Sequence, residues 1–136
     1  MEMAIALPLI LILSLGMLDL GIGVFRYNVL SYAARHAARQ AIVHGSRADR
    51  LGPWGPATLS LTAADPHPIA SAIEPILSAS IDPANVTLEV VWVDGSNEVD
   101  RRVSVTLTAP FLPVMTFIFG NSPHTLRAES IMNIAH

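Results

Sequence analysis

The first 25 residues of the chain are almost entirely apolar. From Met3 to Phe25 the one charged residue is Asp19, and Glu2 stands just before the stretch. As a helix, this stretch would extend roughly 34 Å, close to the hydrocarbon thickness of a bilayer. The pattern therefore predicts a membrane-spanning helix. A cleaved signal peptide is the alternative, but it would have a basic start, which this sequence does not show.

The helical pattern continues after residue 25, where the composition changes. Leu30, Ala34, Ala37 and Ala41 recur at spacings of four, three and four, which places them on one stripe of a helix. Gly45 and Ser46 form a natural helix stop. We therefore predict one helix of about 40 residues, roughly 60 Å long; the alternative is a membrane helix with a fraying extension. The alanine-rich stripe should pack against a globular head or a neighbouring helix.

Gly16, Asp19, Gly23 and Arg26 fall at spacings of three, four and three and so face one direction. A stripe of small residues with one acid and one base is typical of a helix-packing face. Asp19 and Arg26 lie about 10 Å apart along one helix, which is too far for a tight contact. Two hypotheses remain open: the pair forms between chains, or Asp19 is simply hydrated near the headgroups.

Two further positions in the apolar stretch need an explanation. Glu2 borders the hydrocarbon, where a carboxylate is costly unless it reaches the interface or meets a cation. Pro8 has no backbone N–H and clashes with the preceding turn, so it should kink the helix or mark its first turn.

The remaining residues predict a small α+β head. Residues 46–68 are rich in glycine and proline and read as turns, with a weak strand signal in 57–63. Apolar spacing predicts a short helix over 68–80, which Pro75 should distort or shorten. The pattern then predicts an antiparallel hairpin, 86–93 with 102–109, and a third strand, 125–134. The predicted fold is α+β, with the long helix packed on an antiparallel sheet of three or four strands, and the predicted parts are 1–25, 26–45 and 46–136.

Two stretches of the head have a distinctive pattern. Residues 102–109 alternate strictly between apolar and polar, which predicts a half-buried strand. Residues 111–119 are an apolar connection, too short to span a bilayer. These side chains need cover, and three sources are open: the domain's own core, the membrane surface or a partner.

Composition excludes several classes of function. The chain of 136 residues has a net charge of -3, no lysine and scattered arginines, which argues against nucleic-acid binding. It has no cysteine, so disulfides, thiolate zinc sites and thiol nucleophiles are excluded. None of the five histidines has a metal-site spacing, and we interpret them as surface or interfacial. No catalytic motif occurs, so we expect no catalytic residue, metal or cofactor.

Several of these features together resemble the TadE-like family of pilus assembly proteins. The family pattern has a glutamate before an apolar run, an early Leu-Pro, a second acid followed by an apolar residue and glycine, and an alanine- and arginine-rich helix. Here these are Glu2, Leu7-Pro8, Asp19-Leu20-Gly21 and residues 33–41. Residues 103–115 and 126–134 look like the family more loosely.

The resemblance implies a minor pilin or pseudopilin of a tight-adherence type IV pilus system, processed by a prepilin peptidase. Its head would lie outside the bacterial cytoplasmic membrane or in an extracellular filament, and its partners would be other pilin-like subunits and the pilus assembly machinery. Glu2 matches the acid that docks to a neighbouring subunit in such proteins, although it stands closer to the first residue than the usual fifth position. No basic leader precedes it. Either the sequence is that of a processed or shortened chain, or processing does not apply.

The arginines all follow the apolar stretch, which by the positive-inside rule alone would place the head in the cytoplasm. A lost basic leader would reverse that balance, and the resemblance favours the extracytoplasmic side. The alternative function is a single-pass membrane module whose head binds a partner and never polymerises.

Overall fold

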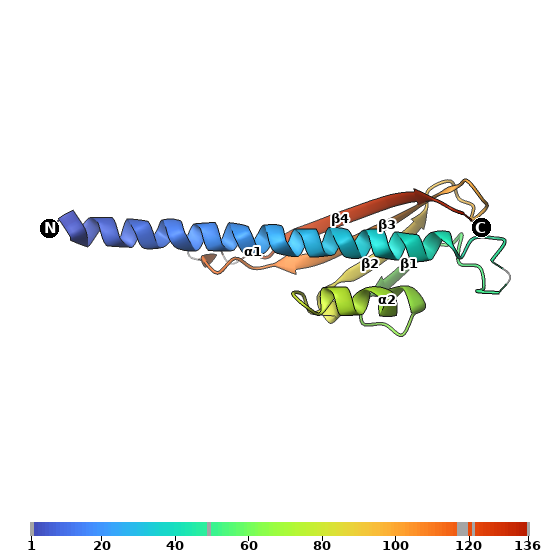
Figure 1. Ribbon diagram of the computed structural model, residues 1–136, viewed down its shortest axis with the longest axis horizontal. Helices are drawn as coiled ribbons and strands as arrows, with labels where there is room; N and C mark the ends of the chain where they lie inside the picture. Colours follow the sequence, from blue (N-terminus) through green and yellow to red (C-terminus); the bar gives the residue numbers. More distant parts are fainter. Residues whose placement is uncertain (1, 49, 117–119, 121, 136) are drawn as a thin grey trace.

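The computed structural model describes residues 2–48, 50–116, 120 and 122–135, with side chains from residue 6 onward. A long helix forms the axis of the molecule, and the head lies along its C-terminal part and reaches its middle, so that the N-terminal end of the helix projects beyond the head (Figure 1). The order of elements is helix α1, strand β1, helix α2, the short 3-10 helix η1, and strands β2, β3 and β4.

Helix α1 (Glu2–Ile42) is one element of 41 residues. Arg39 stands in its last turn, where a cation suits the negative end of the helix dipole. Just beyond the end, Nδ1 of His44 lies 2.8 Å from the carbonyl oxygen of Gln40, one of the last carbonyls without a partner inside the helix. The predicted continuous helix is observed, and it ends shortly before Gly45.

Four strands form one antiparallel sheet in the order β1-β2-β3-β4. Their bounds are β1 (Leu59–Thr62), β2 (Thr87–Trp92), β3 (Arg102–Phe111) and β4 (His124–Asn133). In the central pair, Leu88 lies opposite Leu107 and Val90 opposite Val105, so apolar side chains meet across the strands. The predicted α+β fold class, with the long helix on an antiparallel sheet, is confirmed. The weak strand signal in 57–63 corresponds to β1.

Asp94, near the start of the β2–β3 connection, holds it to the beginning of β3. The carboxylate of Asp94 accepts hydrogen bonds from the backbone N–H of Arg102 at 2.9 Å and from its Nη2 at 2.7 Å. These bonds lower the pKa of Asp94 to about 2. An exposed ion pair therefore joins the two strands of the predicted hairpin at its turn end.

Helix α2 (Pro68–Leu77) is shorter than the predicted 68–80. It contains Pro75, and after Leu77 the N–H groups of Ser80 and Ile81 both return to the Leu77 carbonyl, at 2.9 and 2.8 Å. This tight turn ends the helix. The short helix η1 (Pro83–Asn85), capped by Asp82, then leads into β2.

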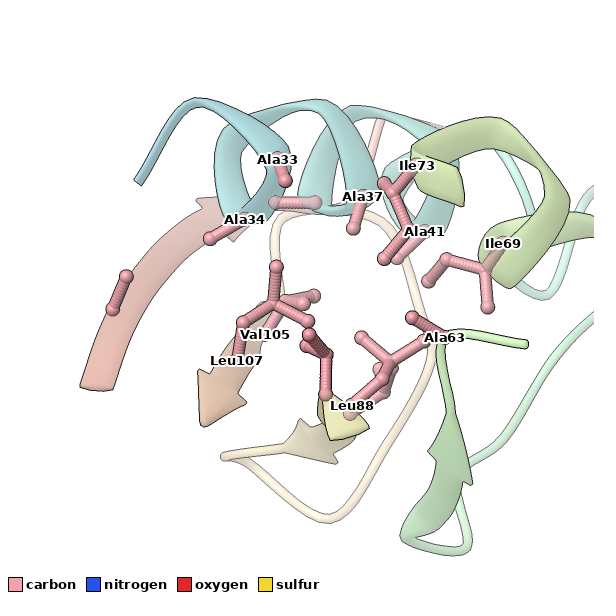
Figure 2. Packing of buried hydrophobic residues seen from close by; sticks show 14 of the residues in the cluster. Ala33, Ala34, Ala37, Ala41, Ala63, Ile69, Ile73, Leu88, Val105 and Leu107 are labelled. Atoms are coloured by element: carbon pink, nitrogen blue, oxygen red, sulfur yellow. The ribbon is translucent and has the colours of Figure 1, made fainter. Parts of the chain in front are cut away.

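The core lies between one face of the sheet and the two helices (Figure 2). Leu30, Ala34, Ala37 and Ala41, the stripe predicted on α1, are each 2% exposed or less. Because three of them are alanines, α1 can approach the sheet closely without leaving voids. Helix α2 covers the rest of this face with three fully buried side chains, those of Ile69, Ile73 and Leu77.

Strand β3 is buried on both faces, which the alternating pattern did not predict. Ser104 and Thr106 lie on its polar face and are each only 6% exposed. Thr106 stands between Glu89 and Glu129 in the ladder, so longer side chains flank its short one. Ser104 donates a hydrogen bond of 2.6 Å to Oε1 of Glu129. The prediction of a half-buried strand is therefore wrong at these two positions, because β3 is a central strand.

A stacked group of rings closes the end of the core. His44 is 8% exposed, and its ring stacks on Trp54 with centroids 3.6 Å apart and planes 9° from parallel. His67, which caps α2, lies 4.9 Å from Trp54. Burial lowers the pKa of His67, and the nearby His44 adds a smaller effect in the same direction. The interpretation of the histidines as surface or interfacial groups is wrong for His44, because Trp54 covers its ring and donates its backbone N–H to the His44 carbonyl at 2.8 Å.

Candidate functional site

The N-terminal half of α1 presents its apolar side chains to the surroundings. Leu7, Ile10, Met17 and Leu20 are each at least 63% exposed. From Ala6 onward the helix is long and apolar enough to cross a membrane, and only 6% of its most apolar window is buried in the chain's own fold. An apolar helix surface of this extent needs lipid or other helices to cover it. This half of α1 suits a membrane anchor.

Asp19 is the one charged side chain in this half that the structure describes, and it is not free. Its Oδ1 accepts a hydrogen bond from the backbone N–H of Val114 at 2.7 Å, and its Oδ2 accepts one from that of Met115 at 2.8 Å. The side chain is only 5% exposed. We call these two bonds the Asp19 clamp. They hold the connection after β3 against the middle of α1.

The clamp changes the interpretation of Asp19. The hypothesis that Asp19 is hydrated near the headgroups is wrong, because its carboxylate is buried and accepts hydrogen bonds from two backbone N–H groups of its own chain. Pairing with Arg26 of another chain stays a prediction, and it would compete with the clamp. Arg26 itself lies over the ring of Phe111, with its guanidinium carbon 5.7 Å from the ring centroid. This is a cation–π distance.

A groove of about 370 Å³ lies beside the clamp, between α1 and the ends of β3 and β4. Its wall on α1 includes Gly16, Asp19 and Gly23, and its other wall includes Phe111 and Pro113. A Cβ atom on Gly23 would lie 3.6 Å from the Phe111 ring, whereas one on Gly16 would meet nothing within 4 Å. The predicted packing face therefore contacts the chain's own hairpin at Gly23. The docking of another helix on it stays a prediction.

The apolar connection after β3 is covered only in part. Pro113 and Met115 are buried, with Met115 1% exposed, while Leu112 and Val114 are 55% and 67% exposed. Met115 lies apart from the core between helices and sheet, because the clamp carries it toward the N-terminal half of α1. Of the three predicted sources of cover, the chain's own fold accounts for Pro113 and Met115 but leaves Leu112 and Val114 exposed. Residues 117–119 lie outside the described residues.

Two predicted positions on α1 remain untested. The side chain of Glu2 lies outside the described residues, so its docking role stays a prediction. Pro8 lies inside α1, which begins at Glu2 and continues through it, so the prediction that Pro8 marks the first turn is wrong. The kink expected there also stays a prediction.

The described part of the chain offers little for chemistry. Within it, no group of three or more histidine, aspartate or glutamate side chains could hold a metal ion. The groove beside the clamp is lined almost entirely by apolar atoms; the polar side chains on its lining are Asp19, Tyr27 and His124, and the carboxylate of Asp19 is already bonded to two backbone N–H groups.

The sequence signal for the clamp was indirect. Asp19 needed a partner, and residues 111–119 needed cover, but no periodicity joins positions 95 residues apart. The absence of any aspartate, glutamate, lysine or arginine between Arg102 and Arg127 is the feature that could have indicated where Asp19 would go.

Comparison with known proteins supports the resemblance in one region. The model of the family described as TadE-like protein matches residues 1–39. No curated protein and no solved structure gave a significant match. The match covers nearly all of α1, including Glu2, Pro8 and Asp19. Over this helix, the resemblance to TadE-like proteins that the sequence indicated is confirmed.

Proposed function

We propose that this protein is a pilin-like structural subunit of a tight-adherence type IV pilus system. It acts as a minor pilin, a pseudopilin or a filament subunit. Before assembly, α1 anchors it in the bacterial cytoplasmic membrane with the head on the extracytoplasmic side, and the assembled form lies in an extracellular filament. The role needs no catalytic residue, no cofactor and no nucleic acid.

One observation carries the proposal: the two halves of α1 have different covers. The second half is buried under the chain's own head, whereas the first half is apolar and largely exposed, with the head reaching it at the Asp19 clamp and at Gly23 (Figure 1). A subunit that moves from a bilayer into a helical bundle needs such a helix, because lipid and neighbouring helices can each cover the same surface. The TadE-like match over residues 1–39 supports the same role.

The proposed contacts follow from that difference. The exposed faces of residues 6–25 pack against the same faces of other pilin-like subunits, and Glu2 docks to a neighbouring subunit. Gly16 offers the closest approach on the groove side, since nothing of the chain itself lies within 4 Å of a Cβ atom placed there. Gly23 is less open, because Phe111 already lies against it.

The test is the fate of the native protein in the cell. We expect it in the sheared extracellular fraction, with a mass-spectrometric N-terminus at or shortly before Met1. A Glu2→Gln variant should reach the membrane normally but be lost from that fraction. Glu74→Gln is the matched control, because it makes the same change at an exposed position of α2 in the head, outside the proposed contact, and should leave assembly unchanged.

Recovery of the native protein only in membranes, with a longer or formylated start, would contradict the proposal. That result would favour the single-pass module. Normal recovery of Glu2→Gln in the sheared fraction would remove the docking role of Glu2 alone.

A further inference from the structure

The depth of Asp19 along α1 sets the problem. A hydrocarbon layer of about 30 Å takes about 20 helical residues. The apolar stretch from Met3 to Phe25 is long enough for such a layer, and Arg26, directly after it, is the first cation. Asp19 then lies roughly 10 Å inside the level of Arg26. The clamp binds Val114 and Met115 to it, so the connection after β3 reaches the same depth.

The exposed side chains of this connection match that depth. Leu112 and Val114 are 55% and 67% exposed, and both are aliphatic. Their neighbours Phe111 and Pro113 line one groove together with Leu20 and Val24 of α1, so the exposed surface of the connection is continuous with that of the anchor. No formally charged residue occurs between Arg102 and Arg127. Such an exposed aliphatic patch is unusual on a protein surface that faces water.

Part of the backbone of this connection is also adapted to an apolar medium. Irregular backbone is tolerated at membrane depth only where it is buried in protein or lines a water-filled cavity, and here Pro113 and Met115 are buried against the chain itself. Pro110 and Pro113 have no N–H to satisfy, and the N–H groups of Val114 and Met115 both donate to Asp19. The same two bonds compensate a carboxylate that would otherwise be costly there. Each partner of the clamp removes the cost of burying the other.

We propose that residues 112–115 form a second membrane contact, which inserts into the acyl chains of the leaflet on the head side. Asp19 is the positioning residue that holds this contact at its depth. The inference rests on the membrane anchoring of α1, which is one part of the proposed function. It adds that the head is fixed to the bilayer at two points rather than tethered by one helix.

The chain has no cysteine, so single-cysteine spin labels can test the contact without background. The full chain would be placed in vesicles of phosphatidylethanolamine and phosphatidylglycerol, at a high lipid-to-protein ratio. Labels would be attached to Leu112→Cys and Val114→Cys. Leu11→Cys on the anchor is the membrane control and Val93→Cys is the water control, because both side chains are exposed, at 52% and 45%. The readout is collision with oxygen, which enriches in lipid, against a polar nickel chelate.

We expect the labels at 112 and 114 to resemble the label at 11 and to differ from the label at 93. If they resemble the label at 93 while the label at 11 is in lipid, the second contact is overturned and the anchoring stands. If the label at 11 is itself in water, the anchoring fails and the inference falls with it. If the label at 112 is protected from the nickel chelate only at a low lipid-to-protein ratio, a second copy of the chain covers it. That result also overturns the inference.

The positioning role has its own readout. Asp19→Asn replaces one acceptor by a donor facing an N–H, so the labels at 112 and 114 should become more mobile and more accessible to the nickel chelate. Ser14→Ala is the control in the same helix and should change neither quantity. Unchanged labels in Asp19→Asn would remove Asp19 as the positioning residue.

Discussion

The two halves of α1 differ in what covers their apolar side chains. Both are helical, but the half after Val29 is amphipathic and buries alanines under a sheet, while the half before Phe25 is apolar and exposes leucines and isoleucines. Short side chains suit a surface that another element of the chain must approach closely. Long branched side chains suit a surface covered by lipid or by other long side chains. The composition of each half thus indicates whether its cover comes from within the chain.

The Asp19 clamp is the exception that sharpens this comparison. It lies in the exposed half, yet it uses the head for its cover. The boundary between the two regimes is therefore not the end of the apolar stretch but the place where the β3–β4 connection reaches α1. Four changes would test this division, and they are ordered here by the size of the expected effect.

The largest effect is expected from Leu30→Ala. Leu30 is fully buried between α1 and the sheet, so its truncation should lower the free energy of unfolding by about 2–5 kcal/mol. Leu11→Ala, at a 52% exposed position on the other half, should leave that free energy within about 0.5 kcal/mol. The measurement is urea unfolding in detergent micelles, followed by the fluorescence of the buried Trp92. Equal losses in the two variants would contradict the comparison.

Asp19→Asn should have the next largest effect. One of the two loop N–H groups loses its acceptor inside a buried site, which costs about 1–3 kcal/mol. The loss should be localised, so hydrogen exchange at Val114 and Met115 should quicken while exchange in β2 stays slow. Slow exchange at both amides in the variant would show that the clamp does not hold the connection.

Gly23→Leu should be destabilising relative to Gly21→Leu. Both changes add the same side chain to the same helix, but only position 23 has the Phe111 ring 3.6 Å from a Cβ atom. Displacing the ring should cost about 1 kcal/mol or more by overpacking. The pair can be compared by thermal unfolding in the same detergent. If Gly21→Leu unfolds at a lower temperature than Gly23→Leu, the groove side of α1 has been assigned wrongly.

The smallest effect is expected from the titration of His67, which belongs to the group of rings just after the C-terminal end of α1. The pKa of His67 lies below its ordinary value of 6.5 in the folded protein, so the unfolded chain binds more protons between these two values. Stability is therefore full above the ordinary pKa and falls as the pH drops through it toward the folded pKa. Protonation also removes the Nδ1 acceptor that caps Ile69.

His67→Asn keeps an acceptor at the cap and removes the titration. The urea midpoint of the wild type should fall between about pH 7 and pH 5, and that of the variant should fall less. An identical fall in both proteins would assign the pH dependence to other groups.

Much of the fold could be predicted because its signals are local. The stripe from Leu30 to Ala41, the apolar spacing in α2 and the alternation in β3 each indicate an element from neighbouring residues. The burial of Ser104 could not be predicted, because it depends on which strands flank β3. Strand order is a property of the whole sheet.

The site was less predictable for the same reason. Asp19 could be identified as a residue that needed a partner, but Arg26 was the nearest candidate in the sequence. The actual partners are two backbone amides from the other end of the chain, and backbone groups leave no mark in a sequence pattern. The stacking of His44 on Trp54 was missed in the same way, because it depends on how a turn-rich segment folds back.

The head is joined to α1 by hydrogen bonds at two distant places. One is the Asp19 clamp, and the other is the bond of 3.1 Å from the N–H of Ala135 to the carbonyl of Ile42. Residues 19 and 42 of a helix are roughly 35 Å apart, and α1 runs lengthwise along β4 between them (Figure 1). A pulling force along the helix axis would therefore load these bonds and the packed core between them in shear, all at once. Peeling the head away from either end would break them one after another. The molecule is built to resist traction along its own length.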